Sequence, residues 1–167
     1  GEYRRQRQMC IRDSSLPNWL VEYQNKINPT FYLKGKWNMN NSFNYDLDSL
    51  FAQKGGGAIK STPYGNTILK DLAIEIIDKE KLGGSYTTDF LTISFSSTDY
   101  IGHQYGPHSD EIKSTYIKLD KDLEDLIKKI ENKIGYENTL IFLTADHGVV
   151  SEPSELLKRK IPGGYYN

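Results

Sequence analysis

Cysteine is almost absent from this chain of 167 residues, which contains only Cys10. A single thiol excludes an internal disulfide framework and any zinc site built from several cysteines. A metal site in this sequence would therefore need imidazole and carboxylate ligands.

Long apolar runs and an excess of one charge are also lacking. No apolar run approaches the roughly 18 residues that suggest a membrane span. The 21 Lys and Arg residues offset 22 Asp and Glu residues, so the net charge is only −1. This balance gives no electrostatic footprint for nucleic acid or an anionic membrane, and we expect neither as a partner.

The first 14 residues differ in character from the rest of the chain. They are basic and aperiodic, and they lack the apolar core of a signal peptide. Residues 9–14 (MCIRDS) resemble translated sequencing-adapter sequence. We therefore expect 1–14 to be non-native, with a disordered basic tail as the alternative.

The remainder divides into two parts by composition and periodicity. Residues 15–60 are predicted to form a cap or insertion region, with a short helix over Leu16–Ile27 followed by irregular chain rich in Asn, Tyr and Gly. Residues 61–167 form the second part and contain the regular apolar periodicity.

Two helices are predicted in this second part by apolar residues at spacings of three and four. The first follows residues 61–63, and the second covers 109–134. Their capping residues are predicted to be Ser61 or Thr62, Gly83, Ser109 and Gly135. The apolar face of the first helix is predicted to comprise Ile68, Leu69, Leu72, Ile76 and Ile77.

Two short apolar runs, 89–95 and 139–143, are typical of buried strands. Because a long helix separates them, they are predicted to form a parallel pair with a right-handed crossover. Ligands of open α/β sheets bind beyond the carboxyl ends of the strands. This rule selects the loops 96–107 and 144–150 as the functional ones.

Both loops contain metal-ligand side chains. Asp99 and His103 are four residues apart, so on a helical turn they share one face and can chelate one ion. Asp146 and His147 are adjacent and converge only where the strand breaks, which Gly148 permits. The alternative is that each Asp–His pair is a hydrogen-bonded contact within its loop.

Other polar residues of the two loops are given plainer interpretations. His108 is interpreted as a solvated loop histidine because it lies between Gly106-Pro107 and a helix cap. No base partner or nucleophile-elbow motif surrounds the hydroxyls in these loops, so they are interpreted as loop hydroxyls. They are Ser96, Ser97 and Thr144.

Three sequence segments together resemble the alkaline phosphatase superfamily. They are 97–103 (STDYIGH), 116–120 (YIKLD) and 142–148 (FLTADHG). The similarity is to the PafA-like bacterial alkaline phosphatases and, more distantly, to nucleotide pyrophosphatase/phosphodiesterases. It extends over about 16–167 and includes 61–66 (STPYGN) and 161–164 (IPGG).

This resemblance implies an α/β fold, specifically a fragment of a three-layer α/β/α fold with two zinc ions at the edge of its sheet. It also implies that residues 61–167 are part of the catalytic core of this fold, truncated at both ends. Asp99 and His103 would bind the first zinc, and Asp146 and His147 the second. The family's nucleophile and its remaining zinc ligands match no residue of this chain, so no catalytic residue is assigned.

The implied activity of the full-length protein is hydrolysis of a phosphate monoester, while the chain alone is expected to be inactive. A phosphodiesterase or nucleotide pyrophosphatase fragment is the alternative within the enzyme class. A non-catalytic α/β binding module, with structural Asp–His contacts, is the alternative outside it. Family habit implies a periplasmic or secreted location.

Overall fold

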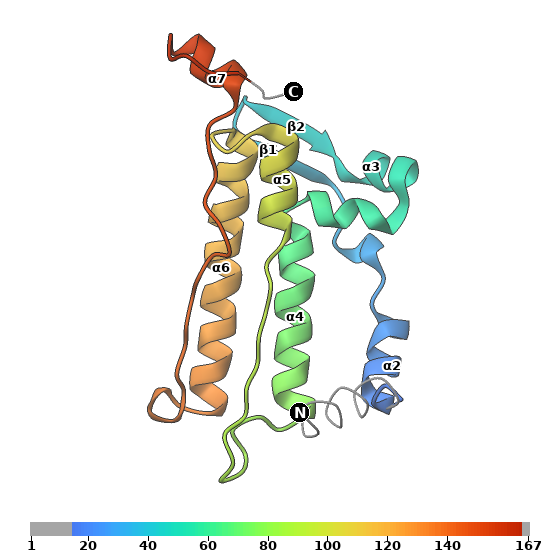
Figure 1. The fold of residues 1–167 in the computed structure, drawn as a ribbon. Helices are drawn as coiled ribbons and strands as arrows, with labels where there is room; N and C mark the ends of the chain where they lie inside the picture. The colour runs from blue at the N-terminus through green and yellow to red at the C-terminus, as the bar shows by residue number, and fades with distance from the viewer. Residues whose placement is uncertain (1–14, 165–167) are drawn as a thin grey trace.

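The computed structural model describes residues 15–164, and its elements are arranged around two long helices that lie side by side (Figure 1). The helices are α2 (Asn18–Lys26), α3 (Leu47–Lys54), α4 (Tyr64–Lys79), α5 (Ser97–Tyr105), α6 (Asp110–Lys133) and α7 (Pro153–Lys158). The strands are β1 (Lys36–Met39) and β2 (Phe43–Asp46), and short 3-10 helices cover η1 (Pro29–Phe31), η2 (Gly55–Ser61) and η3 (Tyr136–Asn138).

The helices predicted from apolar periodicity are confirmed. α2 lies within the predicted range 16–27, and α6 fills the predicted range 109–134. The backbone N–H of Ile112 donates to the Ser109 hydroxyl at 3.2 Å, and Gly135 has a φ of +90° just past the helix end. Both predicted caps of α6 are therefore present.

The start of α4 differs from the prediction, because neither Ser61 nor Thr62 caps it. The N-cap position is held by Pro63, without a side-chain hydrogen bond. The Thr62 hydroxyl instead donates back to the Ile59 carbonyl oxygen at 2.8 Å and so closes the preceding η2 turn.

The fully buried face of α4 also differs from the predicted apolar face. Its inward residues are Gly65, Asn66, Lys70, Ala73 and Ile77. Of the five predicted core positions only Ile77 is fully buried, and the others are half-buried. The face is therefore polar near α5 and apolar at the far end, where Ala73 and Ile77 pack against Leu126 of α6.

Residues 36–54 form a hairpin and a helix, so the prediction of an irregular region is wrong there. β1 and β2 pair antiparallel, with Trp37 opposite Tyr45 and Met39 opposite Phe43. The turn uses Asn40 at a φ of +49°, a backbone conformation that Asn tolerates better than most residues. Alternating apolar and polar residues on either side of an Asn-Asn turn were the available signal.

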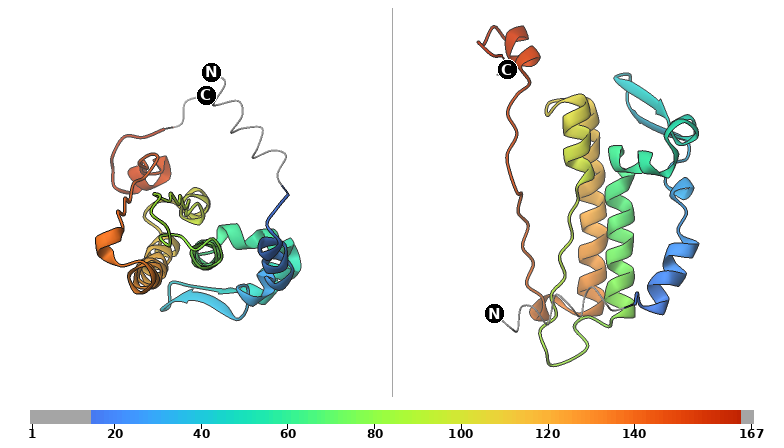
Figure 2. Two further views of the ribbon diagram at one scale, coloured as in Figure 1. Left: turned by 90° about the horizontal axis from the view of Figure 1, so that it is seen from below. Right: turned by 45° about the vertical axis from the view of Figure 1, so that its right-hand side comes forward.

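The two predicted strands are not formed. Residues 88–95 and 139–150 are extended but carry no strand pairing among the described residues. Both run in the same direction beside α6, as Figures 1 and 2 show. A strand needs neighbours for its backbone groups, and within 15–164 no strand lies between or beside these two segments.

The first extended segment still has the side-chain pattern of a strand. Leu91, Ile93 and Phe95 are half-buried against the cluster of α4 and α6, while Thr92 and Ser94 are exposed. The second segment is exposed throughout 140–150. Among residues 15–164, no helix is both long and apolar enough to span a bilayer.

Candidate functional site

Asp99 and His103 are positioned by α5, which begins directly after the first extended segment. They lie one helical turn apart, and Asp99 Oδ1 is 3.4 Å from His103 Nε2. The predicted helical turn is therefore present, and it places both side chains on one face. Both are accessible, with 48% of the Asp99 side chain and 78% of the His103 side chain exposed.

Asp146 and His147 follow the second extended segment, and this brings them to the same end of the molecule. His147 Nε2 lies 3.7 Å from Asp99 Oδ1 and 3.8 Å from Asp146 Oδ2. His103 and Asp146 are 43 residues apart in the sequence, and the two motifs meet at the contact between Asp99 and His147. The structure therefore connects the four predicted residues through three pairwise contacts, Asp99–His103, Asp99–His147 and Asp146–His147.

The His147 ring is oriented by the backbone beside it. Its Nδ1 lies 3.0 Å from the Gly148 carbonyl oxygen, which can only accept a hydrogen bond. The proton of the neutral ring therefore belongs on Nδ1, and the lone pair belongs on Nε2, which faces Asp99. The same bond, followed by the charges of Asp146 and Asp99, raises the pKa of His147 above its ordinary value.

The donor set fits zinc in chemistry and partly in geometry. Two ligands of one tetrahedral zinc, each bonded at about 2.0–2.1 Å, lie roughly 3.3–3.5 Å apart. The Asp99–His103 separation of 3.4 Å matches this spacing. Within 15–164, however, no group of three or more His, Cys, Asp or Glu side chains is arranged to hold a metal ion. The described residues therefore present candidate ligands in pairs.

The other polar residues of the two loops lie in different surroundings. His108 is exposed, as predicted, and its Nε2 lies 2.9 Å from the Ser151 hydroxyl. Ser97 is not a loop residue, because it begins α5 and is only 4% exposed. The Thr144 hydroxyl donates to the adjacent Ala145 carbonyl oxygen at 3.3 Å.

Sequence reasoning assigned no role to Asn66, although its side chain contacts the start of α5. Its Oδ1 accepts the backbone N–H of Ser97 at 3.1 Å, and its Nδ2 donates to the Thr98 hydroxyl at 3.2 Å. Asn66 is 31 residues from Ser97, so no local pattern could reveal this contact.

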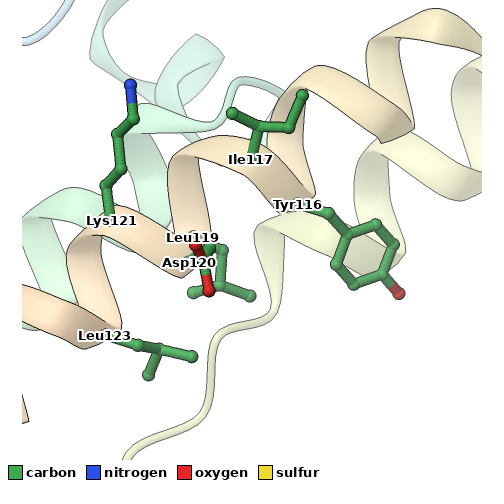
Figure 3. A pocket seen from close by; sticks show the side chains of 6 residues that line it. All are labelled: Tyr116, Ile117, Leu119, Asp120, Lys121 and Leu123. Carbon is green, nitrogen blue, oxygen red and sulfur yellow. The ribbon is translucent and has the colours of Figure 1, made fainter.

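A shallow depression on α6 lies beside the first extended segment (Figure 3). None of the four candidate residues lines it, and it contains no imidazole. Its open, mostly apolar wall offers no converging polar groups of the kind that fix a ligand. Its lining residues are Tyr116, Ile117, Leu119, Asp120, Lys121 and Leu123.

Comparison with known proteins gives related sequences along nearly the whole chain. The profile of the type I phosphodiesterase / nucleotide pyrophosphatase family matches residues 7–164. Alkaline phosphatase PhoV of Synechococcus elongatus is 37% identical over 89% of this chain and 31% of its own length. Alkaline phosphatase PafA of Elizabethkingia meningoseptica is 32% identical over 90% of this chain and 32% of its own length.

The fold is similar to that of a solved alkaline phosphatase. The crystal structure of wild-type alkaline phosphatase PafA superposes with a TM-score of 0.86 at 33% identity, covering 92% of this chain and 34% of that one. The predicted α/β class is thereby confirmed. The chain spans about a third of the length of these relatives. It belongs to the type I phosphodiesterase / nucleotide pyrophosphatase family of the alkaline phosphatase superfamily, and is PafA-like within it.

Proposed function

We propose that the full-length protein is a zinc-dependent phosphate monoester hydrolase, and that this chain supplies half of its two-zinc site. The proposal is supported by one observation above all: Asp99 Oδ1 lies 3.4 Å from His103 and 3.7 Å from His147, although the two motifs come from separate segments. The relatives named alkaline phosphatase give the reaction class.

Each residue of the site has a role that its surroundings support. Asp99 and His103 act as the ligand pair of one zinc, and Asp146 and His147 as the pair of the other. The Gly148 carbonyl holds the His147 ring so that Nε2 stays available, which is the usual outer support of a histidine ligand. When bound, two zinc ions would stabilise the attacking and leaving oxygens of an in-line displacement.

Two ligands per ion are fewer than the three protein ligands that a catalytic zinc usually has. The missing ligands and the nucleophile are therefore proposed to lie outside this chain. Consistent with this, the Ser97 hydroxyl is not accessible to a substrate, because Ser97 is buried at the start of α5.

Zinc titration of the chain tests the ligand assignment. His103→Ala and His147→Ala are each expected to weaken zinc affinity by about tenfold or more, because each removes an imidazole that directly coordinates one of the two zinc ions. His108→Ala is the matched control, since it removes an exposed imidazole from the neighbouring turn. Affinity would be measured by competition with a chromophoric chelator.

The same titration separates the proposal from the non-catalytic module. If the Asp–His pairs are only structural contacts, all three histidine variants will take up zinc like the unaltered chain. If His108→Ala weakens zinc uptake as much as His103→Ala does, the ligand assignment is wrong.

The activity assay addresses the chain and the full-length protein separately. With added zinc, the 167-residue chain is expected not to hydrolyse p-nitrophenyl phosphate. Zinc-dependent turnover would show that its nucleophile lies within this chain and would contradict the assignment.

The alternative substrate class is a phosphodiester, which the description of the matching family favours. The two classes are compared by assaying the full-length protein on p-nitrophenyl phosphate and bis-p-nitrophenyl phosphate. A higher kcat/KM for the diester would replace the monoester proposal while leaving the metal assignment intact.

A further inference from the structure

The N-terminus of α5 has no capping side chain of its own. Ser96 occupies the N-cap position with helical backbone angles (φ −75°, ψ −14°) and makes no side-chain capping bond. The first N–H groups of a helix have no partner within the helix and need an acceptor from elsewhere. For α5, that acceptor comes from another helix.

Asn66 of α4 supplies it. Its Oδ1 accepts the N–H of Ser97, the first residue of α5, at 3.1 Å. Asn66 is 1% exposed and Ser97 is 4% exposed, so water does not compete for this bond. The side-chain oxygen of Asn66 therefore caps the N-terminus of α5 from another helix. An N-cap residue ordinarily makes such a bond from the segment that directly precedes its helix.

The other half of the same amide is also bonded to α5. Asn66 Nδ2 donates to the Thr98 hydroxyl at 3.2 Å, and that hydroxyl donates to the Phe95 carbonyl oxygen at 3.1 Å. One side chain therefore connects α4, the first turn of α5 and the end of the extended segment before it.

The backbone next to Asn66 is packed closely against α5 and η2. A Cβ at Gly65 would overlap the Ser97 hydroxyl and would lie 2.8 Å from the Ile59 carbonyl oxygen. The start of α4 therefore touches the start of α5 directly, and only glycine fits between them.

We propose that Asn66 is a positioning residue of the site, which fixes the first turn of α5 and thereby aims Asp99 and His103. Asp99 is the residue after Thr98, and His103 follows one turn later, so a shift or rotation of this turn moves both side chains. The inference rests on the proposed zinc role of Asp99 and His103.

Two substitutions at Asn66 separate its bonds from its volume. Asn66→Leu keeps a similar size and removes both hydrogen bonds. Asn66→Asp keeps an oxygen to accept the Ser97 N–H and loses the amide that donates to the Thr98 hydroxyl. An acidic side chain at a helix N-terminus is also favoured by the helix dipole.

The matched control is the neighbouring residue on α4. The Thr67 hydroxyl donates to Asp122 Oδ2 at 2.8 Å, and Asp122 is a residue of α6 that is 1% exposed. Thr67→Val therefore removes a buried hydrogen bond between helices without touching α5. Thr67→Val therefore shows how much amide exchange and zinc affinity change when a buried bond away from α5 is lost.

Amide hydrogen exchange over 97–102 is the first measurement, because it needs no metal. Asn66→Leu is expected to speed exchange there about fivefold to tenfold, the usual effect of losing a helix cap. Zinc affinity is the second measurement, and it is expected to fall by about 10- to 100-fold, as for other groups that support metal ligands. Thr67→Val is expected to stay near the unaltered chain in both, and Asn66→Asp, which keeps one of the two bonds, is expected to lie between the unaltered chain and Asn66→Leu.

The outcomes are distinguishable from those of the proposed function. An unaltered chain that takes up no zinc overturns the metal proposal and this inference with it. Normal zinc uptake by the unaltered chain, with unchanged exchange and affinity in Asn66→Leu, overturns this inference alone. Equal losses in Asn66→Leu and Thr67→Val also overturn it, because the effect is then one of general stability.

A further variant covers the case in which Asn66→Leu does not fold. Thr98→Val removes the acceptor of the Asn66 amide, together with the hydroxyl's bond to the Phe95 carbonyl oxygen, and leaves the bond to Ser97 in place. It is expected to weaken zinc affinity by less than Asn66→Leu but measurably. An affinity equal to that of the unaltered chain would contradict the proposed role.

Discussion

Trp37 joins the hairpin to α5 and α6. It is 4% exposed, its Nε1 donates to the Ser114 hydroxyl of α6 at 2.9 Å, and its ring meets Tyr105 edge-on at 5.9 Å. Tyr105 is the last residue of α5. The packing of the hairpin is therefore continuous with the helix that carries Asp99 and His103.

Replacement of Trp37 measures this packing. Trp37→Ala is expected to lower the free energy of unfolding by about 3–5 kcal/mol, because it leaves a cavity among aromatic rings. Trp37→Phe keeps most of the ring and is expected to cost less. Urea unfolding followed by circular dichroism gives both values, with Trp19→Phe as the control, because Trp19 is half-buried and lies outside the aromatic cluster of the hairpin. A loss below about 1 kcal/mol for Trp37→Ala would show that the hairpin is not part of the core.

The proximity of the four candidate residues was predictable because its signal is local. Asp99, His103, Asp146 and His147 stand in short motifs at the ends of apolar runs, and the structure brings their side chains together. Asn66 acts across 31 residues, and the orientation of its amide depends on a turn of α5 that the sequence does not specify. Only tertiary packing reveals such a residue.

At the scale of elements, α4 and α6 are joined by ion pairs at the end away from the site. Asp78 of α4 contacts Lys129 at 2.7 Å and also contacts Lys133, both on α6. Hydrogen bonds from Lys129 and then Lys133 lower the pKa of Asp78 below its ordinary value. The pairing therefore favours the ionised carboxylate in the folded state.

This shift predicts how the contact responds to pH. Because the pKa of Asp78 is lower when folded, its stabilisation is present above the unfolded pKa of about 3.9 and is lost as pH falls through the folded pKa. Asp78→Asn is expected to lower the urea midpoint at pH 7 and to match the unaltered chain at strongly acidic pH. A difference that does not shrink on acidification would contradict this assignment, and added salt is expected to reduce it at pH 7.

The elements themselves show which sequence signals are sufficient. α6 has apolar residues at regular spacing, a capping serine and a terminal glycine, and a helix can satisfy its backbone hydrogen bonds alone. The runs 89–95 and 139–143 have the composition of strands, but a strand depends on neighbours that composition cannot supply. The hairpin was missed because its aromatic residues were interpreted without their period of two.

For the molecule as a whole, the second extended segment is an apolar surface without cover among the described residues. The exposed fractions of Leu140, Phe142 and Leu143 are 79%, 82% and 80%. A contiguous exposed apolar strip of this kind favours association. We expect the isolated chain to bind hydrophobic dyes and to self-associate.

Charged residues placed on this strip test that expectation. The double variant Leu140→Lys, Phe142→Lys is expected to reduce dye fluorescence and the weight-average mass in sedimentation, while changing stability by about 0.5 kcal/mol or less per site. The control is Ala52→Lys, Gln53→Lys, which adds the same charge at exposed positions of α3. Equal effects of the two double variants would show that charge, rather than the strip, controls solubility.

Because the two extended segments run in the same direction, the candidate site lies at one end of the molecule and the turn at 85–87 lies at the other. Both segments reach the candidate site from the same far end of the molecule (Figure 1). At that end Gly83 lies against Ile134, and Tyr86 is fully exposed. A fluorophore or short peptide tag grafted at 85–87 would therefore lie a helix length from the four candidate residues. The turn at 85–87 is therefore a suitable position for immobilising or labelling the protein without contact to the candidate residues.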